Sequence, residues 1–152
     1  MHRKLLLLVL TTAASFGIAA TTMAETTSED AYDYRVAIMT TLKGHLVASS
    51  MIVRGLIEDT GQLAEHANSI ANSLAEFDHV FPEGSNVGDS EALDAVWTDP
   101  EKFAEAYANA KAASAEFAAA ANSGDMEAAG AAFRKVGGSC RGCHDDFKKQ
   151  DD

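Results

Sequence analysis

The sequence is poor in basic residues and in cysteine, and it offers no pairing of residues that suggests an enzyme. It has 12 Lys and Arg against 23 Asp and Glu, which gives a formal net charge of −11. This balance argues against nucleic acid or an anionic lipid surface as the main partner, since both are bound through clusters of Lys and Arg. Two cysteines are too few for a disulfide framework. Because no nucleophile–base pair has support in the sequence, we expect no enzymatic activity.

The first 24 residues have the features of a secretory signal peptide. A basic start at residues 2–4 precedes an apolar run at residues 5–10, a stretch of small residues and a small-x-small cleavage site at residues 22–24. The expected organisation is therefore a signal peptide, 1–24, and one domain, 25–152. Cleavage removes two basic residues and no acid, so the charge changes from −11 to −13. We find no later segment with the roughly 18 apolar residues that a membrane span needs, and we expect a periplasmic protein without membrane contact after cleavage.

Apolar residues repeat at intervals of three to four in four segments, and no useful length alternates with a period of two. The spacing predicts four helices, at residues 28–54, 60–80, 100–122 and 126–149. Two short links and one long one, residues 81–98 with a short helical turn near residues 93–97, join them. This pattern predicts an all-α fold, an antiparallel four-helix bundle.

Capping residues support these boundaries. A capping box from Thr26 to Glu29 is expected at the first helix. Asp99 and Asp125 suit the N-caps of the third and fourth helices, and Pro100 suits the first helical position. Lysines 148 and 149 are expected to favour the C-terminal end of the last helix.

The last helix carries the motif Cys140-Arg141-Gly142-Cys143-His144. C-x-x-C-H is the signature of covalent c-type haem attachment, in which two thiols add to the haem vinyl groups and the adjacent imidazole binds the iron. At 100° per residue, the two cysteines and His144 fall within an arc of about 100°. Gly137 lies on nearly the same face, where a flat macrocycle packs closely against bare backbone, although simple weakening of the helix explains a glycine equally well.

Other readings of the two cysteines remain. A thioredoxin-like C-x-x-C expects a βαβ pattern, which the sequence lacks, and a zinc site needs two further ligands. A local disulfide would make the neighbouring histidine accidental. The remaining histidines of the bundle, His45, His66 and His79, are interpreted as ordinary surface or boundary residues.

The motif and its surroundings resemble the cytochrome c′ family over nearly all of residues 28–150. The matching residues are Tyr34-Arg35, Met39, Phe81-Pro82-Glu83-Gly84-Ser85, Trp97, Val136-Gly137, Cys140, Cys143-His144 and Phe147-Lys148. The resemblance implies one covalently bound haem c, with Cys140 and Cys143 as thioether attachment points and His144 as axial iron ligand. It also implies that Met39 lies over the distal iron face and that Arg35 lies near the haem propionates.

The sixth coordination position of the iron stays open. In typical members of the family the iron is five-coordinate and high-spin, and NO or CO can enter. In low-spin relatives a methionine of the first helix binds the iron, and a Met/His pair raises the potential and suits electron transfer. Arginine at the position of Arg35 accompanies methionine in high-spin members, so the resemblance favours a five-coordinate gas-binding protein that also transfers electrons. A haem-free helical interaction protein is the remote alternative.

Partners are expected on the same grounds. The acidic charge favours redox partner proteins with basic surfaces. Members of the family often form homodimers through the first two helices, so the resemblance allows a homodimer here.

Overall fold

The computed structural model describes residues 26–150, and three of its four long helices begin at a capping side chain. Thr27 accepts a hydrogen bond from the Asp30 amide, Asp99 from the Lys102 amide, and Asp125 from two amides of the following turn. The helices are α1 (Ser28–Val53), α2 (Gln62–Ala75), the 3₁₀-helix η1 (Phe77–His79), α3 (Ala95–Thr98), α4 (Pro100–Ser123) and α5 (Met126–Phe147). The expected signal peptide, residues 1–24, lies outside the described residues.

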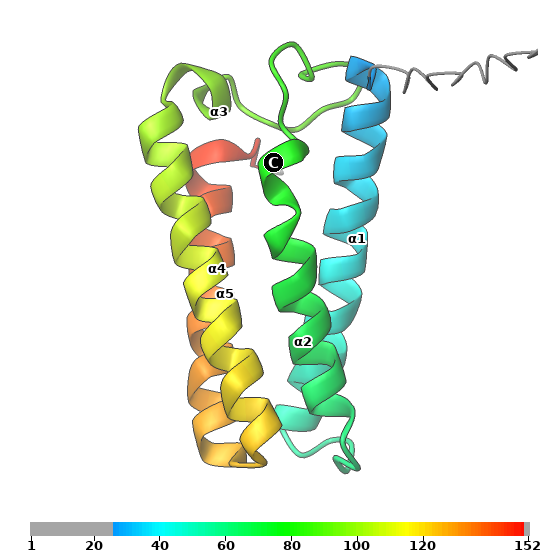
Figure 1. The fold of residues 1–152 in the computed structure, drawn as a ribbon, viewed down its shortest axis with the longest axis vertical. Helices are drawn as coiled ribbons and strands as arrows, with labels where there is room; N and C mark the ends of the chain where they lie inside the picture. The colour runs from blue at the N-terminus through cyan, green and yellow to red at the C-terminus, as the bar shows by residue number, and fades with distance from the viewer. Residues whose placement is uncertain (1–25, 151–152) are drawn as a thin grey trace, which may run out of the picture.

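The four long helices form an antiparallel bundle (Figure 1). α4 packs against α5 and α2, α2 packs against α1, and α1 meets α5. Within residues 26–150 no strand forms, and one isolated bridge joins Ala92 to Lys148. The predicted all-α bundle is therefore confirmed.

The core runs along the bundle axis and is filled by a few large side chains among many alanines. Leu63, Ile70, Phe117 and Val136 are almost completely buried. Around them pack small residues contributed by α4 and α5, namely Ala110, Ala121, Ala129 and Ala132. Small residues allow the helices to approach closely but supply little side-chain volume.

Three predicted boundaries are wrong in detail. The N-cap of α1 is Thr27, so the predicted capping box is one residue out of register. The second helix was predicted to reach residue 80, but α2 ends at Ala75 and continues as η1, because a tighter turn carries both Phe77 and Val80 into the core. The last helix was predicted to reach residue 149 but ends at Phe147, where the chain becomes extended.

The first long helix is more apolar at its surface than expected. By length and composition α1 is able to cross a membrane, with a mean hydropathy of 1.5 over 18 residues, of which 17% are buried. The prediction that no segment after residue 24 meets this criterion is therefore wrong. Its Val, Ile, Met and Ala are interspersed with Thr, Ser and Gly, so no unbroken apolar run signals the helix.

Candidate functional site

A cavity of about 700 Å³ lies between the four long helices and is walled mostly by apolar side chains. Its size is in the range of small-molecule and cofactor sites. All five residues selected from the sequence line this cavity, namely Arg35, Met39, Cys140, Cys143 and His144. The fold thus brings together residues that are about 100 positions apart in the chain.

Helix α5 presents the two cysteines and the histidine to the cavity because its other face is anchored in the bundle. Asp125 fixes the start of the helix, and Val136 and Phe147 are buried on either side of the motif. Residues 140, 143 and 144 are then turned toward the cavity, as the helical spacing predicted.

The surroundings of the two thiols favour their protonated form. Burial raises the pKa of Cys140, and burial together with the charges of Cys140 and Asp146 raises the pKa of Cys143 to about 11. Redox-active C-x-x-C motifs have the opposite property, a lowered thiol pKa, so this site is unlike a thioredoxin centre. Both cysteines are free, and residues 26–150 contain no group of three or more His, Cys, Asp or Glu placed to hold a metal ion, which weighs against the disulfide and zinc readings.

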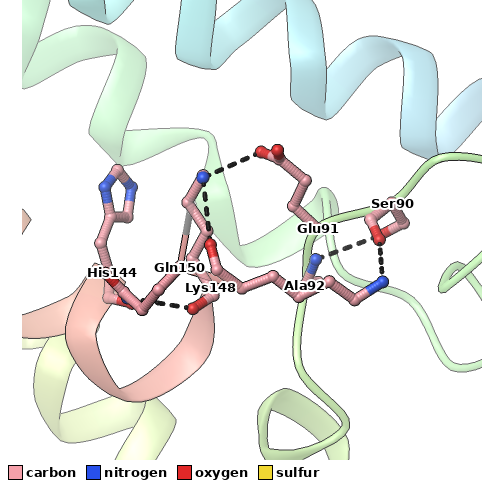
Figure 2. Close-up of polar contacts among 7 residues, drawn as sticks. Ser90, Glu91, Ala92, His144, Lys148 and Gln150 are labelled. Carbon is pink, nitrogen blue, oxygen red and sulfur yellow. Dashed lines mark hydrogen bonds and ion pairs between the residues drawn. The ribbon is translucent and has the colours of Figure 1, made fainter. Parts of the chain in front are cut away.

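The imidazole of His144 is suited to donate a lone pair. Its surroundings lower its pKa, first by desolvation and then by the positive charge of Lys148, against opposing contributions from Asp145 and Glu91. The ring is therefore neutral at neutral pH, the form that binds metals. Figure 2 shows the ring standing apart from the polar contacts beside it, while its backbone carbonyl accepts from Gln150.

Arg35 is buried in the cavity wall, with 6% of its surface exposed. Its guanidinium donates to the Val80 carbonyl at 2.8 Å, to the hydroxyl and carbonyl of Ser85, and to the Ser90 hydroxyl. It also lies 4.7 Å from the ring centroid of Phe81. All four acceptors are neutral, and burial lowers the Arg35 pKa. The cavity wall thus holds a positive charge that no carboxylate among the ion pairs of residues 26–150 neutralises.

The segment after α5 pairs with the loop that follows η1, and residues of both line the cavity. The Leu93 amide donates to the Phe147 carbonyl at 2.9 Å, and the Lys149 amide donates to the Glu91 carbonyl at 2.7 Å. Lys148 forms an ion pair with Glu91 (Figure 2). The Lys149 ammonium donates to the Ser90 carbonyl. Lys148 is the C-cap of α5 and Lys149 follows it, so both lysines lie at the C-terminal end of the helix, as predicted. Their pairing with the loop is a contact that no local pattern signals.

Four residues discussed from the sequence lie outside the cavity wall. Gly137 is exposed, and a Cβ added there would meet nothing within 4 Å. His79 is exposed, as predicted. His45 and His66 lie at the boundary, as predicted, but they also contact each other.

The chain is similar to known proteins along most of its length. The model of the family described as Cytochrome C′ matches residues 30–148. The cytochrome c′ of Rhodospirillum rubrum is 33% identical over 138 residues, which cover 90% of this chain and 94% of that protein.

Solved structures agree with this result. A ferrous variant of cytochrome c′ from Alcaligenes xylosoxidans with bound NO has a TM-score of 0.78 and 28% identity, covering 84% of this chain and 100% of that one. A carbon monoxide-bound variant from the same organism has a TM-score of 0.76 and 28% identity, covering 82% and 98%. A family match along most of the chain, the C-x-x-C-H motif facing a bundle cavity and the shared fold together place this chain in the cytochrome c′ family.

Proposed function

We propose that this chain carries one covalently attached haem c and binds small neutral gases, NO and CO, at a five-coordinate, high-spin iron. The observation that carries this proposal is that both motif cysteines, the motif histidine and Met39 line one and the same cavity. Family membership implies a c-type haem, and the NO and CO complexes of the relatives support gas binding.

The cavity wall fits such a group on three counts. Its apolar side chains suit a porphyrin face, and the neutral His144 suits an axial metal ligand. The buried guanidinium of Arg35, which has only neutral acceptors in its hydrogen bonds, suits the anionic propionates at the edge of a haem. The thiols of Cys140 and Cys143 lie on the same helix face as the imidazole and would form the thioethers.

Apolar walls favour neutral ligands over anions. When bound, haem c would supply an iron able to bind a diatomic ligand. The apolar side chains that a ligand in the cavity would meet include Leu42, Leu46 and Phe77. These apolar side chains offer an anion no hydrogen-bond donor, so an anion in contact with them would lose its hydration, whereas NO and CO lose little. We infer a binding protein rather than an enzyme.

The alternative function is low-spin electron transfer with Met39 as sixth ligand. The specific observation in its favour is that the Met39 side chain lines the same cavity as His144. A thioether bond to the iron would raise the reduction potential and close the site to gases. In either case the acidic surface favours redox partners with basic surfaces.

Two optical measurements on the exported protein test these functions. A pyridine haemochrome assay checks for thioether-linked haem, and its absence in a host with working haem-attachment machinery would support the haem-free interaction protein. A visible spectrum of the reduced protein with and without CO then separates the other two. Rapid CO binding to a broad high-spin Soret band is the expected result, and sharp α and β bands without a CO response would favour Met39 ligation.

We further propose that residues 1–24 direct export to the periplasm. Cell fractionation with N-terminal sequencing tests this, with Glu25 expected as the first residue of the periplasmic form.

A homodimer through α1 is proposed as well, because Tyr34 and Met51 on this helix are exposed without lining the cavity. Sedimentation analysis of the wild-type protein and of Met51→Asp tests it: a dimer that dissociates in the variant is expected, and a wild-type monomer would refute it.

A further inference from the structure

His45 of α1 and His66 of α2 face each other across the interface of the first two helices. Their Nδ1 atoms lie 3.0 Å apart. Their ring centroids are 5.2 Å apart, and the ring planes make an angle of 53°. Neither residue lines the 700 Å³ cavity, although His66 borders a second, smaller hollow together with Gln62 and Ile52. The pair is therefore separate from the residues that would hold haem.

The two imidazoles are accessible as well as close. Each is half-buried, so an ion is able to reach them from solvent without opening the bundle. His66 lies in the first turns of α2, whereas His144 lies near the end of α5, and these two regions are at opposite ends of the bundle in Figure 1. The chain as a whole carries a net charge of −11, which attracts cations.

The distance between the two nitrogens fits a chelate. Imidazole nitrogens bind divalent transition ions at about 2.0–2.1 Å. An ion at that distance from two atoms 3.0 Å apart makes a nitrogen–metal–nitrogen angle of about 91–97°. This is close to the right angle between neighbouring ligands in tetragonal Cu²⁺ and Ni²⁺ sites, and it is smaller than the tetrahedral angle that Zn²⁺ adopts.

Ion binding would replace the hydrogen bond between the two imidazoles with two nitrogen–metal bonds, and it would release no proton. In the hydrogen-bonded pair one Nδ1 carries a hydrogen and the other accepts it. To bind an ion through both Nδ1 atoms, the donor ring must carry its hydrogen on Nε2 instead. Each ring must also turn so that its lone pair points about 43° away from the line between the nitrogens, toward the ion. Such a turn is a side-chain rotation at the protein surface.

We propose that His45 and His66 form a two-histidine site for a divalent transition ion in tetragonal geometry, with Cu²⁺ as the best-fitting ion. Water completes the coordination, because residues 26–150 contain no group of three or more His, Cys, Asp or Glu placed around one ion. Cu²⁺ also binds nitrogen ligands more tightly than the other divalent ions of its row. Since the two ligands come from different helices, the bound ion would join α1 to α2.

The test is a titration of the complete, haem-loaded protein with Cu²⁺, followed by calorimetry and by electron paramagnetic resonance. We expect one ion bound with hyperfine coupling to two nitrogens. His45→Ala and His66→Ala should each leave one nitrogen and weaken binding about a hundredfold, because a chelate becomes a single ligand. His45→Gln and His66→Gln repeat the test with polar side chains of similar length, and the circular dichroism of every variant checks that the bundle is intact.

His79→Ala is the matched control. It removes an exposed histidine that lies outside the pair, and the stoichiometry and affinity should stay at the wild-type values. A second readout is thermal unfolding, in which added Cu²⁺ should raise the midpoint of the wild type and of His79→Ala but not of either pair variant. Equal Cu²⁺ affinity in the wild type and the pair variants would overturn the proposal, as would loss of the site in His79→Ala.

Discussion

Arg35 donates hydrogen bonds to both oxygen atoms of Ser85, to the hydroxyl at 3.1 Å and to the carbonyl at 2.9 Å. Through this fork a helix residue fixes a loop residue 50 positions later, and the same guanidinium reaches Val80 and Ser90. The loop that follows η1 is thus held against α1 at the edge of the cavity. Ser90 in turn accepts from Lys149, so the chain after α5 is tied to the same loop.

Replacing Arg35 should loosen this arrangement. Arg35→Met leaves four buried oxygen acceptors without their donors and should lower the free energy of unfolding by about 2–4 kcal/mol. Arg35→Lys keeps the charge but not the fork, and we expect an intermediate loss. Chemical denaturation measures both. Arg54→Met, an exposed site at the C-cap of α1, is the control and should change the stability little, whereas equal stability of Arg35→Met and the wild type would contradict the structure.

Two tyrosines offer a matched test of side-chain hydrogen bonds. The Tyr107 hydroxyl donates to the Leu74 carbonyl at 2.7 Å in a half-buried position, and Tyr34 donates to Glu76 at the surface. Tyr107→Phe should cost about 1 kcal/mol, because the carbonyl at the end of α2 loses its side-chain donor. Tyr34→Phe should cost less, because water replaces the partner of Glu76. Urea unfolding of the two variants decides the order, and a larger loss for Tyr34→Phe would refute this reasoning.

Much of the fold and the site was predictable because it depends on local rules. The helical spacing of residues 140, 143 and 144 places them on one face wherever the helix packs, and the caps at Asp99 and Asp125 act within one turn. The hydrogen-bond partners of Arg35 were not predictable, because they lie in a loop with no periodic pattern. The early end of α5 likewise depends on the pairing of the following residues with Leu93 and Glu91. The contact of His45 with His66 depends on how two helices are rotated about their axes.

Alanine substitutions at Gly137 and Gly138 test whether Gly137 is needed for a haem to pack against α5 or simply weakens the helix. Neither would bring a new Cβ within 4 Å of any described atom, so alanine at either site should stabilise the haem-free chain by up to about 1 kcal/mol. Only Gly137 lies seven residues before His144, on nearly the same face. If a macrocycle packs there, Gly137→Ala should reduce haem incorporation while Gly138→Ala should not. Haem content per chain measures this, and equal incorporation would leave helix weakening as the whole explanation of Gly137.

Substitution of Met39 distinguishes the two proposed haem functions, because each function predicts a different spectral change. With a five-coordinate iron, Met39→Ala should leave the high-spin spectrum of the reduced protein nearly unchanged and should speed CO binding, because a side chain is removed from the cavity wall. With methionine ligation, the same change should convert a low-spin spectrum to a high-spin one. Met51→Ala is the control, since Met51 is exposed on the same helix and does not line the cavity.

The stability of the Met39 variant serves as an independent check on packing. Truncation of a partly buried methionine should lower the free energy of unfolding by no more than about 2–3 kcal/mol, so the bundle should remain folded and the spectra interpretable. We expect the high-spin spectrum to persist and CO to bind faster. A clear low-spin to high-spin conversion in Met39→Ala, absent from Met51→Ala, would instead assign the sixth ligand to Met39 and make electron transfer the function that the cavity serves.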